Sequence, residues 1–203
     1  MADETAAVGS TSPGAGNTAP ASDSGTTGLA GGRAGIVRQS GVHQAMIDCE
    51  PGTILPPPSE AHVQEVESFY GIKLPQDYHQ FLVQANGCTP VRRQFRQGNR
   101  ERMIERFLPI LDDAPNDTKN GWADVEVVAS QLDSRLASDL DGENIDLIPV
   151  AALFAGDFIV LDYRGNGAEP SVAVWDHEAS DDFNPAVETV SASFAEFLDR
   201  LQN

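Results

Sequence analysis

The chain has 203 residues, with 31 Asp and Glu against 13 Lys and Arg, so its formal net charge at pH 7 is −18. Hydrophobic residues make up 40% and charged residues 22%, which is an ordinary globular composition that is short of bases. This balance argues against general binding to nucleic acid or to an anionic membrane, because both need Lys and Arg. It permits a basic protein partner, since complementary charge speeds encounter.

The first 35 residues form a low-complexity segment, since 27 of them are Gly, Ala, Ser, Thr or Pro. Such a segment cannot bury enough apolar surface to offset about 1–2 kcal/mol of backbone entropy per residue, so we expect a disordered leader. Asp3 and Glu4 stand where a signal peptide carries its basic region, and no apolar run follows them. We therefore do not expect an export signal.

Prolines separate this leader from the rest of the chain. Pro51 and the run Pro56-Pro57-Pro58 interrupt regular structure, and the run favours a stiff polyproline II spacer. We predict a disordered low-complexity leader and proline-rich linker over 1–54, and one folded domain over 55–203. A domain of about 150 residues is large enough for one hydrophobic core.

The sequence also limits the compartment in which the protein works. No run of 18 apolar residues occurs, which predicts that no segment spans a membrane. The chain has two cysteines, Cys49 and Cys88, which are too few for a disulfide framework. Without an export signal we expect both to be reduced thiols in the cytoplasm. Cys88 is predicted to be a buried small apolar residue, and Cys49 to be the more exposed of the two.

Two helices are predicted at the start of the domain. Ser59 is a suitable N-cap, apolar residues at helical spacing follow it, and Gly71 ends the first helix. Pro75 suits the first position of a second helix, which ends at Asn86-Gly87. Both residues of that pair tolerate the left-handed conformation of a helix C-cap, so we expect the pair to stop the helix.

Strand signals dominate the second half of the domain. The apolar patterns predict strands over 107–111, 147–150, 157–162 and 172–175, and a third helix over 124–138. A turn that contains Gly and Asn joins the last two strands as an antiparallel hairpin. A closing amphipathic helix begins at Ser193, with Glu196 as its capping-box partner. This order predicts an α+β fold with a mostly antiparallel central sheet flanked by helices.

Charge is distributed unevenly along the domain. Residues 92–106 hold six arginines against two glutamates, whereas residues 107–203 hold 20 acidic and four basic residues. The six are Arg92, Arg93, Arg96, Arg100, Arg102 and Arg106. This arginine cluster could bind phosphate or an acidic partner segment. In the simpler interpretation, which we prefer, it pairs with acidic residues of the later half.

No motif of a catalytic or metal site is complete. His177-Glu178 begins like the zinc motif H-E-x-x-H, but Asp181 stands in place of the second histidine. The acidic run that begins at Asp139 has the initial spacing of a calcium loop, but Asn144 replaces the required glycine. We therefore predict no metal, no cofactor and no enzymatic activity. An acid/base or metal hydrolase would need a site that the sequence does not show.

Two blocks of residues form a recognisable pattern. The first block contains Tyr70-Gly71-Ile72-Lys73-Leu74-Pro75, Asp77-Tyr78, Phe81-Leu82 and Asn86-Gly87. The second contains Ile148-Pro149-Val150, Gly156-Asp157-Phe158-Ile159, Leu161-Asp162 and Val174-Trp175-Asp176-His177-Glu178, followed by Phe194, Phe197 and Leu198. In order and spacing, these blocks resemble the SUKH superfamily of Smi/Knr-type cell-wall regulators and bacterial immunity proteins. The resemblance covers about residues 58–201; the arginine cluster and the leader depart from the family pattern.

The resemblance implies an α+β fold with a central sheet and no chemistry of its own. Bacterial members of the family are typically immunity proteins that bind a toxin and block it, and fungal members resemble regulators of cell-wall synthesis and signalling. No catalytic residue can be carried over, because the family has none. We therefore favour an immunity protein that neutralises a cognate toxin. The alternative is a scaffold or regulator of cell-wall assembly or signalling.

The acidic surface indicates the kind of partner. It suits a basic toxin domain, and a nuclease above all, because the acidic side chains can mimic nucleic acid. We place the partner-binding surface on acidic loops of the domain, although such side chains can also be no more than solvated charges. The candidate residues are Asp112, Asp113, Asp117, Asp139, Asp141, Asp181 and Asp182.

Overall fold

The computed structural model describes residues 47–138, 146–165 and 169–203. Residues 1–46 of the predicted leader lie outside the described residues. In the described part, the α-helices are α1 (Glu60–Tyr70), α2 (Gln76–Ala85), α3 (Val125–Leu132) and α4 (Phe194–Asp199). The strands are β1 (Gln94–Gln97), β2 (Arg100–Phe107), β3 (Leu147–Leu153), β4 (Phe158–Asp162), β5 (Ser171–Trp175) and β6 (Val187–Ser191). No helix in these ranges is both long and apolar enough to cross a membrane.

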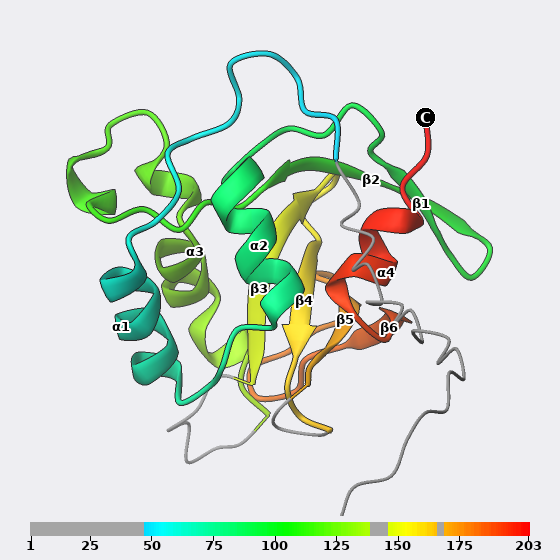
Figure 1. Ribbon diagram of the computed structural model, residues 1–203. Coiled ribbons are helices and arrows are strands. Elements are labelled where there is room, and N and C mark those ends of the chain that lie inside the picture. Colours follow the sequence, from blue (N-terminus) through cyan, green and yellow to red (C-terminus); the bar gives the residue numbers. More distant parts are fainter. Residues whose placement is uncertain (1–46, 139–145, 166–168) are drawn as a thin grey trace, which may run out of the picture. The chain divides into compact units, whose positions relative to one another are not determined.

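The strands form one sheet in the order β1-β2-β3-β4-β5-β6, and each neighbouring pair is antiparallel. Figure 1 shows α2 and α4 in front of the strands, with α1 and α3 side by side at the left. This arrangement confirms the predicted α+β fold with an antiparallel sheet and flanking helices. Strands β3, β4 and β5 are buried along most of their length, which explains why their sequences are continuous apolar runs.

Local sequence signals set the ends of the first two helices. The Ser59 hydroxyl accepts a hydrogen bond from the His62 backbone N–H at 3.2 Å, and Gly71 is left-handed, with φ 66°, after the last turn of α1. The Asn86-Gly87 pair ends α2 as predicted. Of the two residues, only Gly87 is left-handed, with φ 67°, whereas Asn86 has φ −50°.

Asn86 acts through its side chain instead, which is fully buried and joins three segments of the chain. Its Nδ2 donates to the backbone oxygens of Pro56 at 2.7 Å and Ile110 at 2.9 Å. Its Oδ1 accepts a hydrogen bond from the Ile110 backbone N–H at 3.0 Å. The proline run before α1 is thereby held against the segment that follows β2.

An aromatic cluster joins α2 and α4 to the sheet. Phe194 of α4 contacts Tyr78 and Phe81 of α2 and Phe107 of β2, with ring centroids 4.9, 5.1 and 6.0 Å apart. All four side chains are buried. Large aromatic contacts of this kind dominate the energetics of a core, so the cluster fixes how both helices lie on the sheet.

Most of the predicted strands are confirmed, and the later hairpin with them. The runs over 147–150, 157–162 and 172–175 lie within or around β3, β4 and β5. Strands β4 and β5 pair antiparallel with Asp162 opposite Ser171, as the predicted hairpin requires. The Ser193 hydroxyl accepts a hydrogen bond from the Glu196 backbone N–H at 3.2 Å and so begins α4.

Two predicted elements are wrong in position or extent, and one strand of the sheet was not predicted. The strand predicted over 107–111 lies earlier in the chain, as β2. The arginine cluster falls in the β1–β2 hairpin, where buried residues such as Phe95 and Ile104 alternate with charged ones. Helix α3 ends at Leu132 and continues as a single 3₁₀ turn, rather than reaching residue 138. Strand β6 was not predicted, since its middle is exposed and carries no apolar run.

Residues before the proline run also contact the domain. We call residues 47–50 the lead-in segment. The Glu50 N–H donates to the Thr89 oxygen at 2.8 Å, and the Val91 N–H donates to the Asp48 oxygen at 2.8 Å. The lead-in segment therefore forms a short antiparallel bridge with the chain between α2 and β1.

Candidate functional site

A groove lies between the proline run and the loop that follows β2. Pro56, Pro57 and Pro58 form one wall, residues 110–119 supply the other, and the volume is about 490 Å³. The Asn86 side chain holds the two walls together. A second tie is the hydrogen bond from the Ser59 backbone N–H to Asp112 Oδ1, at 2.8 Å. Because these bonds join its walls, the groove is preformed.

Three of the predicted candidates, Asp112, Asp113 and Asp117, line this groove. Asp117 Oδ1 accepts hydrogen bonds from the backbone N–H groups of Asn120 at 2.8 Å and Lys119 at 2.9 Å. These two hydrogen bonds lower the pKa of Asp117 below its usual value. At neutral pH the groove therefore presents carboxylate charge, and Lys119 is the one cation among its lining residues.

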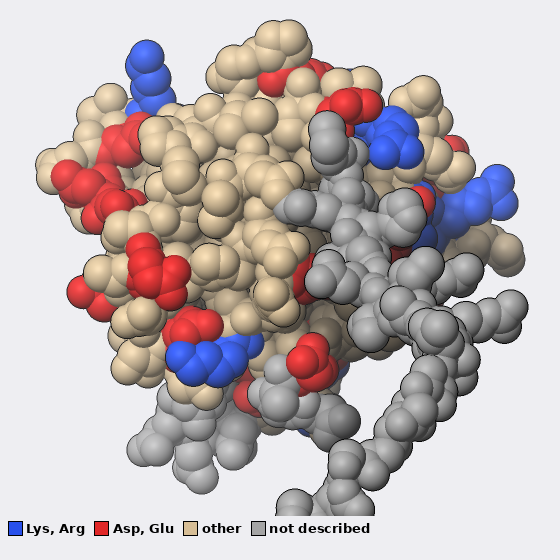
Figure 2. Space-filling view, viewed as in Figure 1, with Lys and Arg blue, Asp and Glu red and all other residues tan. Residues whose placement is uncertain are grey.

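Charge is unevenly distributed over the face of the domain that Figure 2 shows, although both signs occur on each side. Acidic side chains gather at the left of the view, over α1 and the loop after β2. Basic side chains gather at the right, over the β1–β2 hairpin. The uneven charge along the sequence thus becomes an uneven charge in space, with the groove on the acidic side.

Trp122 is an exposed aromatic residue beside the groove, which the sequence analysis did not single out. Its side chain is 63% exposed, its Nε1 donates to the Lys119 oxygen at 2.9 Å, and the Arg106 guanidinium lies 5.6 Å from its ring centroid. Trp and Arg are enriched among the residues that carry binding energy at protein interfaces. A tryptophan in a polar loop is a usable signal, but its exposure cannot be read from the sequence.

Two of the other predicted candidates, Asp181 and Asp182, are not among the residues that line the groove. Asp181 and Asp182 lie in the connection between β5 and β6. Asp182 Oδ1 accepts a hydrogen bond from the Ser134 hydroxyl at 2.9 Å, which ties this connection to the end of α3. Asp139 and Asp141 lie outside the described residues, as does the rest of the acidic run 139–145.

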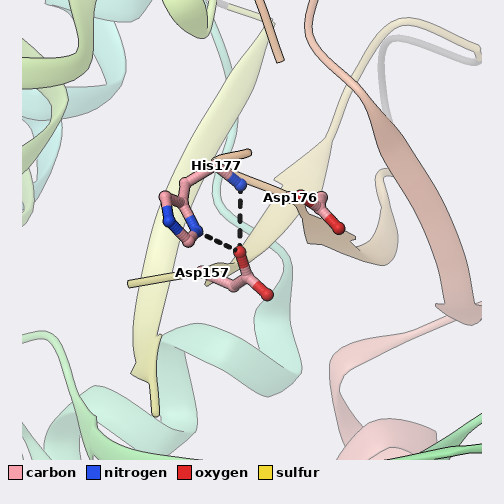
Figure 3. Close-up of side chains that lie close together, drawn as sticks. All are labelled: Asp157, Asp176 and His177. Atoms are coloured by element: carbon pink, nitrogen blue, oxygen red, sulfur yellow. Dashed lines mark hydrogen bonds and ion pairs between the residues drawn. The ribbon is translucent and has the colours of Figure 1, made fainter. Parts of the chain in front are cut away.

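A second cluster of charged residues joins β2, β4 and the end of β5 (Figure 3). Asp157, only 4% exposed, accepts hydrogen bonds at Oδ1 from the backbone N–H of His177 at 2.9 Å and from its Nδ1 at 2.8 Å. Its Oδ2 accepts a hydrogen bond from Arg102. Burial by itself raises the pKa of Asp157, but the hydrogen bonds from His177 and the charge of Arg102 outweigh it and lower the pKa below its usual value.

The same cluster contains the residues that could hold a metal ion. Ligand atoms of Asp157, Asp176 and His177 lie within 4.8 Å of one another. However, Arg102 already bonds Asp157, and its Nη2 lies 3.7 Å from Asp176 Oδ2. The Arg102 guanidinium supplies the positive charge that a metal ion would supply to the two carboxylates, and it would repel such an ion. The arrangement fits an internal ion-pair network better than a metal site.

The arginine cluster is divided among several internal contacts. Arg102 pairs with Asp157 and Asp176, and Arg100 pairs with Asp176, so two of the six arginines pair with acidic residues of the later half, as the preferred interpretation expects. Arg93 lies 3.7 Å from a carboxylate oxygen of Glu50 in the lead-in segment. Arg106 stacks on Trp122 and donates to the Gly87 backbone oxygen at 3.2 Å.

The comparisons with known proteins agree with the fold and with the two sequence blocks. Residues 57–200 match the SMI1 / KNR4 family (SUKH-1). A search of the curated proteins found no match to this chain. The family match spans the described domain from the proline run through α4, and covers more than half of the chain. The chain therefore belongs to the SMI1 / KNR4 (SUKH-1) family.

Proposed function

We propose that this chain is a non-catalytic immunity protein, which binds a cognate toxin domain in the cytoplasm and blocks it, with a nuclease toxin favoured. Family membership supports binding, because SUKH proteins are generally non-catalytic and include both immunity proteins and Smi/Knr-type cell-wall proteins. The preformed groove, which three aspartates line, is the observation that supports our choice of the toxin-binding surface.

The chemistry of the groove favours a cationic segment as its occupant. The proline wall, with Ile110 and Leu111, offers apolar surface to the stem of a Lys or Arg side chain, and the carboxylates accept its charged head. A nuclease carries such side chains because it must bind phosphates. A toxin segment held in the groove cannot contact nucleic acid at the same time, so binding alone is sufficient for inhibition.

Co-production with a candidate toxin, sought first in the neighbouring gene, tests the proposal. We expect wild-type chain to restore growth and, when purified, to inhibit the toxin at an equimolar ratio. The triple variant Asp112→Asn, Asp113→Asn, Asp117→Asn keeps one accepting side-chain oxygen at each position but removes three charges. We expect it to weaken toxin binding by about 10-fold or more at low salt and by less at high salt.

A matched variant removes the same charge elsewhere. Glu101, Glu105 and Glu178 are exposed and do not line the groove, so their replacement by Gln should leave binding nearly unchanged. Equal weakening by both triple variants would mean that net charge, and not the groove, recruits the partner. Growth arrest of cells that co-produce abundant chain would contradict the proposed immunity function itself.

The alternative is a scaffold or regulator of cell-wall assembly or signalling. Family membership motivates it as well, because the family includes Smi/Knr-type cell-wall proteins beside the immunity proteins. Affinity purification of the tagged chain from its own cells separates the two functions. An immunity protein should return one toxin, whereas a scaffold should return several cell-wall or signalling proteins and should lose them when residues 1–54 are deleted.

A further inference from the structure

The two cysteines lie far apart in the sequence and are neighbours in the fold. Cys49 forms the antiparallel bridge with Pro90, two residues beyond Cys88. The Cys49 side chain packs against the core that contains Cys88, each thiol affects the pKa of the other, and both are free. Cys49 Sγ also contacts the Ile47 backbone oxygen, at 3.9 Å. Nothing in the groove or in the ion-pair network uses these thiols.

The two thiols differ in how they meet solvent. Cys88 is fully buried in the hydrophobic core, as predicted, whereas Cys49 is half-buried at the edge of that core. Burial raises the pKa of both thiols, and that of Cys88 lies well above its usual value. Because Cys49 is the more accessible thiol, an oxidant in solution meets it first, and Cys88 is placed to react with the oxidised product.

We propose that Cys49 and Cys88 are a redox modification site, at which a peroxide converts the two thiols into a disulfide. The Cys49 thiolate attacks the peroxide; an S–O bond forms, the O–O bond breaks and hydroxide leaves. The sulfur of Cys88 then attacks Cys49 Sγ, so that the S–S bond forms and the S–O bond breaks. The two thiol protons and hydrogen peroxide leave as two water molecules.

The disulfide would staple the lead-in segment to the sheet. The Cys88 backbone oxygen accepts a hydrogen bond from the Phe107 N–H of β2 at 2.8 Å, so a covalent bond at Cys88 also anchors Cys49 to that strand. The bridge closes a loop of about 40 residues, which restricts the unfolded chain. We expect oxidation to raise the melting temperature by about 10 °C.

The test uses the purified full chain, first reduced and desalted, then treated with hydrogen peroxide at pH 8.5. We expect a mass loss of about 2 Da without a gain of oxygen, and the joint disappearance of both titratable thiols. The melting temperature should rise as stated above, and dithiothreitol should reverse each change. Oxygen gained at Cys49 with Cys88 still free, or a disulfide between two chains, would overturn the proposal.

Two variants make the result specific to this pair. Cys49→Ser removes the half-exposed thiol and leaves the core side chains in place; it should show neither the mass loss nor the rise in melting temperature. Cys88→Ala removes the resolving thiol, so Cys49 should accumulate added oxygen. A rise in melting temperature of the Cys49→Ser variant on peroxide treatment would show that the stabilisation comes from elsewhere.

Discussion

Asp157 and His177 belong to the second sequence block, and their contact explains what that block does. Their side chains are 20 residues apart in sequence, yet Asp157 bonds both the backbone and the ring of His177 and pairs with Arg102 of β2. Gly156 is left-handed, with φ 93°, and the His177 ring lies 3.6 Å from where a Cβ would stand. These residues join three strands, so the pattern contributes to holding the fold together.

Replacing Asp157 by Asn should therefore cost stability in a pH-dependent way. The pKa of Asp157 is lowered in the folded state, so its stabilisation is present above the unfolded pKa of about 4 and is lost as pH falls through the folded pKa. We expect Asp157→Asn to lower the free energy of unfolding by about 2 kcal/mol at pH 7 and by much less near pH 3. Urea unfolding across this pH range measures both.

Asp181→Asn is the control, since Asp181 is exposed. We expect this replacement to change the free energy of unfolding by less than about 0.5 kcal/mol. The stabilisation by Asp157 belongs to its ionised form. A deficit of Asp157→Asn that stays constant down to pH 3 would instead assign the effect to packing.

At the scale of elements, the sequence was informative where one residue type dominates. Strands β3, β4 and β5 are continuous apolar runs and were predicted, as were the caps at Ser59 and Ser193. The β1–β2 hairpin was missed because its exposed positions carry Arg and Glu, which hide the alternation of buried residues. Strands of this kind depend on pairing with a neighbour, which no local pattern reveals.

The turn between β3 and β4 offers a test at this scale. Ala155 has φ 75° there, a left-handed conformation that costs a residue with a Cβ about 1 kcal/mol or more. We expect Ala155→Gly to raise the free energy of unfolding by about 0.5 kcal/mol, because the relief of strain exceeds the added entropy of the unfolded chain. Thermal unfolding should show a higher melting temperature.

The neighbouring glycine supplies the opposite change. Gly156→Ala places a Cβ on a residue with φ 93°, so we expect it to destabilise the protein by about 1–2 kcal/mol. If Ala155→Gly also lowers the melting temperature, the left-handed conformation at residue 155 is not strained, and the entropy of glycine decides the sign.

For the whole molecule, the candidate surface was predictable only in part. Asp112, Asp113 and Asp117 are close in sequence and could be grouped by composition. The groove itself needs the proline run, which is more than 50 residues earlier, and a buried asparagine that was expected only to end a helix. The approach of Cys49 to Cys88, through the bridge of Cys49 with Pro90, also joins segments that are distant in sequence. Neither follows from spacing, because both depend on how distant segments meet.

The extent of the folded unit gives the last prediction. The sequence placed the domain at 55–203, yet the lead-in segment bridges the chain after α2, and Ile47 and Cys49 pack against the core. A chain that begins at residue 47 should melt within about 1 °C of the full chain, since residues 1–46 carry few large apolar side chains.

A chain that begins at residue 55 loses the backbone pairing and the buried apolar area of the lead-in segment. We expect its melting temperature to fall by about 5–10 °C, because each kcal/mol is worth about 2–4 °C in a domain of this size. Equal melting temperatures for the two truncated chains would place the boundary at 55 after all.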